Sequence, residues 1–307
     1  MESIKVALDW SPNTIHAGLF LAHHKKYYQD SGLEVSFISP EIDEYALTPA
    51  RRLSRQQVDF AIAPSESAIS YNTSRRPVPL TSVASILQRD TSAIVTLKSS
   101  AVTRPAQLDG RVYASYNARF EDGIVRKMVQ YDGGRGDFKS VAIGRLSIWD
   151  MLKKGEADAT WVFMPWEGVQ AQMSGIELNV FALEDYGIPY GYTPLLLAHT
   201  SRIHRRKEAY RRFMKITAAA YKEAGAAPQE TAAFLCKHIE HEDFSEPAFI
   251  EASLRALQPA LLTQDGEWGK MNAKVWGSFI NWLVDQKILR PQRPVEGKYM
   301  FTNELLE

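Results

Sequence analysis

A short segment near the start of this 307-residue chain combines residue types that suit ligand binding. Asp9, Trp10, Asn13 and His16 follow directly on the apolar residues 6–8. Asn13 can cap a following helix by accepting a backbone N–H, which would put an aromatic ring and several polar groups at the carboxyl end of a strand. Open α/β sheets bind ligands at that edge. Taken alone, the segment is explained equally well as turn chemistry with Trp10 in the core.

Further polar and aromatic residues follow other apolar runs of the chain. With the first four they form our candidate ligand contacts: Asp9, Trp10, Asn13, His16, Ser65, Glu66, Thr91, Tyr116, Asn117, Trp166, Glu167, Tyr186, Tyr190 and Tyr192. Stacking a flat ring on aromatic side chains gains about 0.5–1.5 kcal/mol per pair beyond burial. A carboxylate such as Asp9, Glu66 or Glu167 that accepts from an amine adds about 1.5–3 kcal/mol. These types favour a small planar heterocycle with an amino group over a sugar phosphate.

Core packing is the other interpretation of each aromatic ring. We favour the core for Trp161 and Phe163. We favour the site for Trp10, Tyr190 and Tyr192, because these three lie next to glycine or proline turns.

Catalysis has little support in the sequence. The motifs HExxH, GxSxG, GxGxxG and the P-loop are all absent. His23 and His24 are adjacent on a predicted helix and point apart, so they do not form a metal site together. Ser65 and Ser67 have no neighbouring base in the sequence. We therefore assign no catalytic residue, no metal ligand and no cofactor.

Composition narrows the class of protein further. Lysine plus arginine and aspartate plus glutamate both number 36, which argues against nucleic acid as a partner. The single cysteine, Cys236, allows neither an internal disulfide nor a cysteine-based metal site. No run of 18 apolar residues could span a membrane, and residues 4–8 predict a strand rather than a leader. The chain as written is expected to be cytoplasmic, or extracytoplasmic if a signal peptide has been removed.

The elements that must position these residues alternate between strand and helix up to about residue 200. Strands at 4–8, 34–38 and 58–63 with helices at 13–29 and 46–55 predict a βαβαβ unit and a parallel sheet. Strands at 80–87 and 93–97 leave this unit. A second unit contains strands at 111–115, 138–142, 158–163 and 177–182 and helices at 119–131, 146–154 and 165–173.

After residue 200 the pattern is helical only. Tyr210, Phe213 and Tyr221 recur at helical spacing, and further helices are predicted at 228–238, 246–257 and 270–286. We predict an α/β protein of two lobes with a ligand cleft between them. Lobe 1 comprises residues 1–97 and 198–307, including the C-terminal helices, and lobe 2 comprises 98–197. Residues 195–199 form the strand that returns to lobe 1.

The motif Asp9-Trp10-x-Pro12-Asn13-x-x-His16 resembles a family of proteins that handle thiamine-pyrimidine precursors. This family contains bacterial formylaminopyrimidine-binding proteins of uptake transporters and the fungal hydroxymethylpyrimidine phosphate synthase. Other similar segments are residues 27–35, 58–61, 108–110, 155–159 and 185–189. The general pattern is shared with sulfonate- and nitrate-binding proteins. The resemblance implies a type II periplasmic-binding-protein fold that closes over its ligand, with Trp10 and residues 186–192 contacting a pyrimidine.

Two departures from the family pattern bear on function. The synthase has a lysine and a substrate-donating histidine where this chain has Ala63 and Ser67, and a cysteine-rich run where this chain has residues 194–198. The binding proteins have an acidic residue after the tyrosines, where this chain has Thr193. Glu66 or Glu167 could take the place of that acid.

Three interpretations remain open. The leading one is a non-catalytic binding protein for a thiamine-type pyrimidine, serving uptake or salvage, with a membrane transporter as partner if the protein is extracytoplasmic. The second is a cytosolic synthase-like enzyme of pyrimidine-precursor synthesis, which would need pyridoxal phosphate and iron. The third is a binding protein for another small ligand such as a sulfonate, with backbone N–H donors from residues 117–119.

Overall fold

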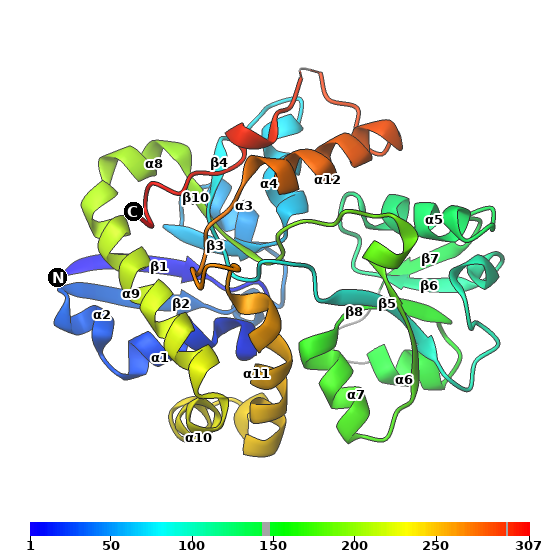
Figure 1. The fold of residues 1–307 in the computed structure, drawn as a ribbon, viewed down its shortest axis with the longest axis horizontal. Helices are drawn as coiled ribbons and strands as arrows, with labels where there is room; N and C mark the ends of the chain where they lie inside the picture. Colours follow the sequence, from blue (N-terminus) through cyan, green and yellow to red (C-terminus); the bar gives the residue numbers. More distant parts are fainter. Residues whose placement is uncertain (143–147, 293) are drawn as a thin grey trace. The chain divides into compact units, whose positions relative to one another are not determined.

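Unit 1 is built around a five-stranded sheet with the order β2-β1-β3-β10-β4 (Figure 1). Its strands are β1 (Glu2–Ala7), β2 (Leu33–Ile38), β3 (Phe60–Ala63), β4 (Leu80–Ser85) and β10 (Leu195–His199). β1 pairs in parallel with β2 and β3, so their carboxyl ends lie at one edge of the sheet. β10 runs antiparallel to β3 and β4. Every residue of β3 and β10 is buried, as expected for central strands covered on both faces.

The helices of unit 1 come from both halves of the chain. They are η1 (Thr14–His16), α1 (Ala17–His24), α2 (Tyr27–Asp30), η2 (Pro40–Asp43), α3 (Pro49–Ser54), α4 (Ser65–Thr73), α8 (Thr200–Arg205), α9 (Lys207–Ala226), α10 (Pro228–His238), η6 (Glu242–Phe244), α11 (Pro247–Leu261) and η7 (Gly297–Tyr299). α9 and α10 pack against α1. The C-terminal helices therefore complete the core of the first sheet, as the helical spacing from Tyr210 onward predicted.

Unit 2 has its own five-stranded sheet with the order β7-β6-β8-β5-β9. Its elements are β5 (Ser92–Leu97), η3 (Pro105–Leu108), β6 (Val112–Ser115), α5 (Glu121–Tyr131), β7 (Lys139–Ala142), α6 (Ile148–Lys153), β8 (Ala159–Phe163), the π-helical turn η4 (Met164–Gly168), α7 (Val169–Met173), β9 (Leu178–Ala182) and η5 (Leu183–Tyr186). β6 is parallel to β7 and β8, and β5 is antiparallel to β8 and β9.

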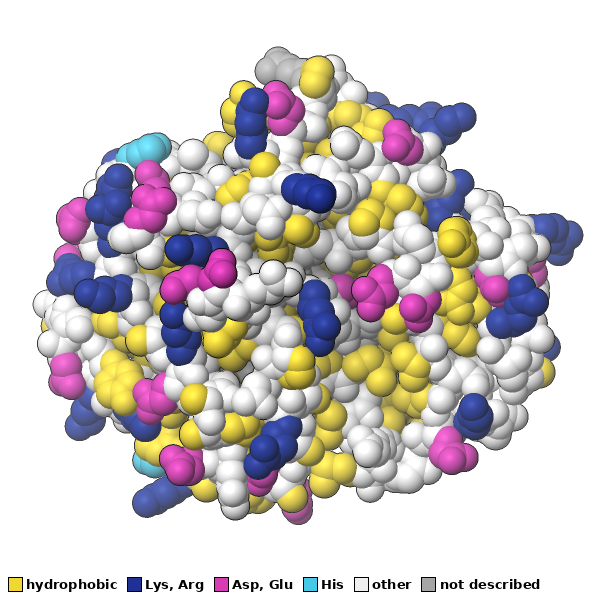
Figure 2. Space-filling view, viewed as in Figure 1, with side chains coloured by type: hydrophobic (Ala, Val, Ile, Leu, Met, Phe, Trp, Pro, Cys, Tyr) yellow, Lys and Arg dark blue, Asp and Glu magenta, His cyan; other side chains and the backbone are white. Residues whose placement is uncertain are grey.

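The computed structural model describes residues 1–142, 148–292 and 294–307. Unit 1 comprises Met1–Asp90, Gly191–Gly277 and Pro291–Glu307, and unit 2 comprises Thr91–Tyr190 and Ser278–Arg290. α12 (Ala273–Asp285) contributes residues to both. Within the described ranges, no helix is long and apolar enough to cross a membrane. On the face drawn in Figure 2, basic and acidic side chains are interspersed.

The structure corrects several sequence predictions. β5 belongs to the second sheet because β8 and β9 are its hydrogen-bonding partners. The first segment of unit 1 therefore ends at Asp90, and not at residue 97 as predicted for lobe 1. The helix predicted at 13–29 is interrupted, because Lys26 adopts a left-handed backbone conformation with φ of 64°. Most of the helix predicted at 146–154 is α6; its first two residues lie outside the described ranges.

Gly18 lets α1 approach α9 closely. A Cβ at this position would overlap the Tyr221 ring, which is stacked on Trp268 at 4.6 Å and donates a hydrogen bond to the Ile15 carbonyl at 2.7 Å. We expect Gly18→Ala to lower the free energy of unfolding by about 1–3 kcal/mol, because the ring must move in a packed core. Urea unfolding measures this.

The matched control is Gly277→Ala in α12, where an added Cβ meets nothing within 4 Å. This variant should gain about 0.5–1 kcal/mol from helix propensity. Equal effects of the two substitutions would contradict the packing argument.

Candidate functional site

The loop after β1 holds Asp9 in a fixed position through His16. Asn13 caps η1, because its Oδ1 accepts from the Ile15 N–H at 2.9 Å. The Asn13 backbone N–H donates to His16 Nδ1 at 3.2 Å. Nδ1 is thus an acceptor, so the ring proton is on Nε2, which donates to Asp9 Oδ1 at 2.7 Å. The backbone therefore selects the histidine tautomer that binds the carboxylate.

His16, Asn13 and Asp9 differ in how far their side chains are exposed to solvent. His16 is completely buried, whereas the Asp9 side chain is 25% exposed. Asn13 is buried, and its Nδ2 donates to the Ser11 carbonyl at 2.9 Å. His16 and Asn13, both expected from the sequence as ligand contacts, are buried, and their hydrogen bonds fix the position of Asp9. The carboxylate keeps its second oxygen, Oδ2, outside the bond to His16.

The residue after Asp9 forms an aromatic pair with a residue that follows the neighbouring strand. Trp10 contacts Tyr45 with ring centroids 4.8 Å apart and planes tilted by 55°. Tyr45 follows β2, the strand beside β1, and has a left-handed φ of 62°, as does Glu44 with 56°. Left-handed backbone at a non-glycine residue costs energy and is concentrated at functional sites. Tyr45 is not among the residues predicted from the sequence. The sequence feature that could have indicated it is its aromatic type at a position following a predicted parallel strand.

The third strand end of unit 1 is closely packed. Ser65 and Glu66 form the first turn of α4, directly after β3, and both are buried. Ser65 Oγ donates to the Gly191 carbonyl at 3.0 Å. Tyr192 is 3% exposed, its hydroxyl accepts from the Asn272 N–H at 3.0 Å, and burial raises its pKa. These contacts of Ser65 and Tyr192 anchor residues 191–192 within unit 1.

In unit 2 the loop after β6 is organised by Glu121, which the sequence analysis did not single out. Glu121 Oε1 accepts from the Tyr113 hydroxyl at 2.8 Å and from the Tyr116 N–H at 3.0 Å, and Oε2 accepts from the Ala118 N–H at 3.0 Å. The Asn117 N–H donates to Ser115 Oγ at 3.0 Å, and Asn117 has a φ of 59°. Burial raises the pKa of Glu121, and its hydrogen bonds oppose that shift.

The loop after β8 places Trp166 and Glu167 in the π-helical turn η4, a feature often found at functional sites. Glu167 Oε2 accepts from the Phe163 N–H at 2.9 Å, and Trp166 is 7% exposed. Tyr116 is 40% exposed, and its pKa is raised by partial burial and then by the charges of Glu167 and Glu121. Tyr116 and Glu167 therefore act on each other.

Thr91 is the first residue of unit 2 and lies at the edge of the second sheet where β8 ends. Its carbonyl accepts from the Met164 N–H at 3.0 Å. Among the described residues, its buried Oγ1 has no hydrogen-bond partner.

Two predicted contacts lie elsewhere in unit 2. Tyr186 contacts Tyr131 with ring centroids 6.2 Å apart. Tyr131 is the last residue of α5, and Tyr116 precedes the first, so about 16 Å of helix separates them. Tyr190 packs between Trp161, at 5.4 Å, and Phe279, at 4.9 Å. The structure does not bring Tyr186 to the Tyr116 loop.

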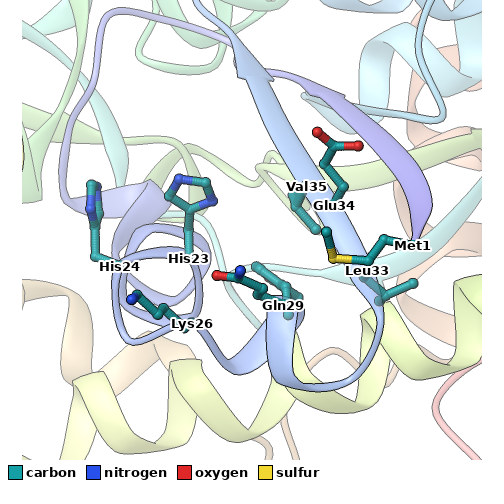
Figure 3. A pocket seen from close by; sticks show the side chains of 9 residues that line it. Met1, His23, His24, Lys26, Gln29, Leu33, Glu34 and Val35 are labelled. Carbon is teal, nitrogen blue, oxygen red and sulfur yellow. The ribbon is translucent and has the colours of Figure 1, made fainter.

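A separate hollow of about 390 Å³ lies at the amino end of β2. Figure 3 shows His23, His24, Lys26 and Gln29 on one side and Leu33, Glu34 and Val35 on the strand. None of the candidate contacts lines it. Burial, followed by the charges of His23 and His238, lowers the pKa of His24. In the part of the chain that the structure describes, no group of three or more histidine, cysteine or acidic residues could hold a metal ion.

Comparison with known proteins assigns the chain to a family. The family model described as NMT1/THI5 like matches residues 13–231. The chain belongs to the NMT1/THI5-like family. A formylaminopyrimidine-binding protein of Halalkalibacterium halodurans is 23% identical over 99% of this chain and 90% of its own length.

Other relatives match over shorter stretches. A putative thiamine biosynthesis protein of Haemophilus influenzae is 28% identical over 67% of this chain and 64% of its own. A 4-amino-5-hydroxymethyl-2-methylpyrimidine phosphate synthase of Saccharomyces cerevisiae is 23% identical over 52% of this chain. The chain spans only 45% of that synthase.

Solved structures identify the fold. The alkanesulfonate-binding protein SsuA of Xanthomonas axonopodis pv. citri, bound to MOPS, superposes with a TM-score of 0.73 at 14% identity and covers 98% of both chains. A Candida albicans protein described as having the generic periplasmic binding protein fold superposes with a TM-score of 0.59 at 12% identity, over 96% of this chain and 99% of its own. The fold is that of the periplasmic binding proteins, as the sequence predicted.

Proposed function

We propose that this protein binds a small planar aminopyrimidine of the thiamine-precursor class and serves uptake or salvage. The observation that carries the proposal is the partly exposed Asp9 carboxylate, which His16 holds in the same loop as Trp10, whose ring contacts Tyr45. The formylaminopyrimidine-binding relative matches nearly the whole chain and supports this ligand class.

The chemistry of Asp9 selects a ligand that donates hydrogen bonds. A carboxylate has only acceptors, and its bond to a ligand amine contributes about 1.5–3 kcal/mol. Adjacent aromatic faces contribute about 0.5–1.5 kcal/mol per ring pair. A pyrimidine with an exocyclic amine satisfies both requirements in one rigid molecule.

A sulfonate is the second candidate ligand, because the solved relative SsuA is an alkanesulfonate-binding protein. Anions are bound by free backbone N–H groups near helix N-termini. In unit 2 the N–H groups of Tyr116, Asn117 and Ala118 already donate to Glu121 and Ser115. In unit 1 the first turn of α4 carries the buried acid Glu66. Both features disfavour an anionic ligand.

The synthase alternative has less support. Where the resemblance implies a lysine and a histidine, the chain has Ala63, buried at the end of β3, and Ser67 in the first turn of α4. The buried Glu66 beside Ser67 would repel the phosphate of pyridoxal phosphate. These residues do not fit the cofactor, and we propose no step through it.

Calorimetric titration tests the proposed function. Purified protein is titrated with hydroxymethylpyrimidine, its formylamino relative and thiamine, and with ethanesulfonate as the anionic control. We expect saturable heat with at least one pyrimidine and none with ethanesulfonate. No heat with any pyrimidine, or heat with ethanesulfonate alone, would contradict the proposal. Mass spectrometry of small molecules that copurify with the protein identifies the natural ligand.

A further inference from the structure

Glu121 is a buried acid whose bonds all come from its own unit. It is 2% exposed and forms the first residue of α5. Its carboxylate accepts from one phenolic hydroxyl and two backbone N–H groups at 2.8–3.0 Å. Among the described residues, no lysine, arginine or histidine lies within 4.0 Å to form an ion pair with it.

The position of Glu121 explains how this charge is tolerated without a cation. The first turn of a helix leaves backbone N–H groups unpaired and has a partial positive charge. α5 has eleven residues, long enough for this effect to develop. The residues that precede it supply further amides, which the left-handed Asn117 turns toward the carboxylate side of the loop. The arrangement has the donors that a bound anion would need, and Glu121 uses them.

We propose that Glu121 is a built-in anion that occupies the donor set of the loop before α5, and that it determines the ligand charge this loop accepts. With Glu121 in place, the Tyr116 and Ala118 amides are satisfied, and a carboxylate lies where an anion would accept from them. A neutral or cationic ligand is tolerated next to Tyr116, and an anion is repelled. The consequence for selectivity rests on the proposed function, whereas the occupation of the donor set does not.

Chemical rescue tests the occupation directly. Glu121→Ala leaves the Tyr113 hydroxyl and the Tyr116 and Ala118 amides without their acceptor, next to a space the size of a small carboxylate. Thermal unfolding of this variant is compared in equal concentrations of sodium formate and sodium chloride. We expect formate to raise the unfolding midpoint of Glu121→Ala well beyond any effect of chloride. The unchanged protein and Glu121→Asp, which keeps a carboxylate, should show no formate-specific rise.

A second measurement applies if Glu121→Ala does not fold. Glu121→Gln preserves the side-chain shape but replaces one acceptor oxygen with a donor, which opposes an N–H group of the loop. Hydrogen exchange should become at least tenfold faster at the Tyr116 or Ala118 amide and stay unchanged in β3, which is in unit 1. Unchanged exchange at both amides, or no formate-specific rise in a folded Glu121→Ala, overturns the inference.

The calorimetric titration with pyrimidines distinguishes a failure of this inference from a failure of the proposed function. If formate rescues Glu121→Ala but no pyrimidine binds the unchanged protein, the built-in anion stands and the proposed function fails. If pyrimidines bind but rescue is absent, the proposed function stands and this inference fails. Where both hold, Glu121→Ala should also acquire measurable heat with ethanesulfonate.

Discussion

Replacing Asp59 with alanine should lower the free energy of unfolding by about 3–5 kcal/mol, because it leaves two partly buried guanidinium groups and the buried Tyr210 hydroxyl without their acceptor. Asp59 is 4% exposed and precedes β3. Its Oδ1 accepts from Arg202 Nη1 at 3.1 Å, from Arg206 Nη1 at 2.5 Å and from the Tyr210 hydroxyl at 2.9 Å. Its Oδ2 accepts from the Lys5 N–H at 2.9 Å. One carboxylate thus joins β1, α8 and α9.

Urea unfolding measures this loss, and hydrogen exchange in β3 assigns it to unit 1. Asp59→Asn should cost less than Asp59→Ala, because an amide oxygen still accepts from one partner. The matched control is Asp137→Ala, whose side chain is 76% exposed and 3.9 Å from its arginine partner. That change should stay within about 0.5 kcal/mol. A loss at Asp59 no greater than at Asp137 would show that the network contributes nothing to stability.

Asp9→Asn should weaken binding of the aminopyrimidine by about 10- to 150-fold, which corresponds to the 1.5–3 kcal/mol of a charge-assisted hydrogen bond. The asparagine oxygen can still accept from His16 Nε2, so the loop keeps its conformation. The amide nitrogen then replaces Oδ2 and presents a donor to the donor of the ligand. Calorimetry gives the affinity, and thermal unfolding verifies that stability is retained.

Two further variants test whether the loss of affinity is specific to Asp9. His16→Phe keeps a ring at the buried position but removes the bond to Asp9, so it should also weaken binding. Glu34→Gln alters an exposed carboxylate on β2 and should leave affinity unchanged. If Asp9→Asn binds the pyrimidine as tightly as the unchanged protein does, Asp9 is not the ligand acceptor. Loss of affinity in Glu34→Gln would show that the effect is not specific to the position of Asp9.

Local patterns were sufficient for the elements that carry the candidate site. The strands predicted at 4–8 and 58–63 correspond to β1 and β3. All four residues of β3 are apolar and buried, as expected for a central strand covered on both faces. The Asp9–His16 segment was correctly expected at a strand end, because proline and a capping asparagine terminate and restart structure locally. The family motif then indicated the fold.

Other features depend on partners distant in the sequence. β5 looks like an extension of the first sheet, and only its pairing with β8 and β9, more than sixty residues later, assigns it to the second. Tyr192 adjoins a glycine and is predicted to contact a ligand, and its bond from the Asn272 amide, eighty residues later, is visible only in the structure. Neither partner can be inferred from neighbouring residues.

The sequence by itself determined the order of strands and helices, the βαβαβ unit and the residue types at the strand ends, since these follow from periodicity and local backbone chemistry. The tertiary structure decided which of those residues can meet a ligand. His16 is buried with both nitrogens engaged, whereas the Asp9 side chain is partly exposed, so Asp9 is the group we propose for the ligand. Tyr45 joins Trp10 only because β2 lies beside β1. Burial and hydrogen-bond partners arise from packing, and packing is what assigned these roles.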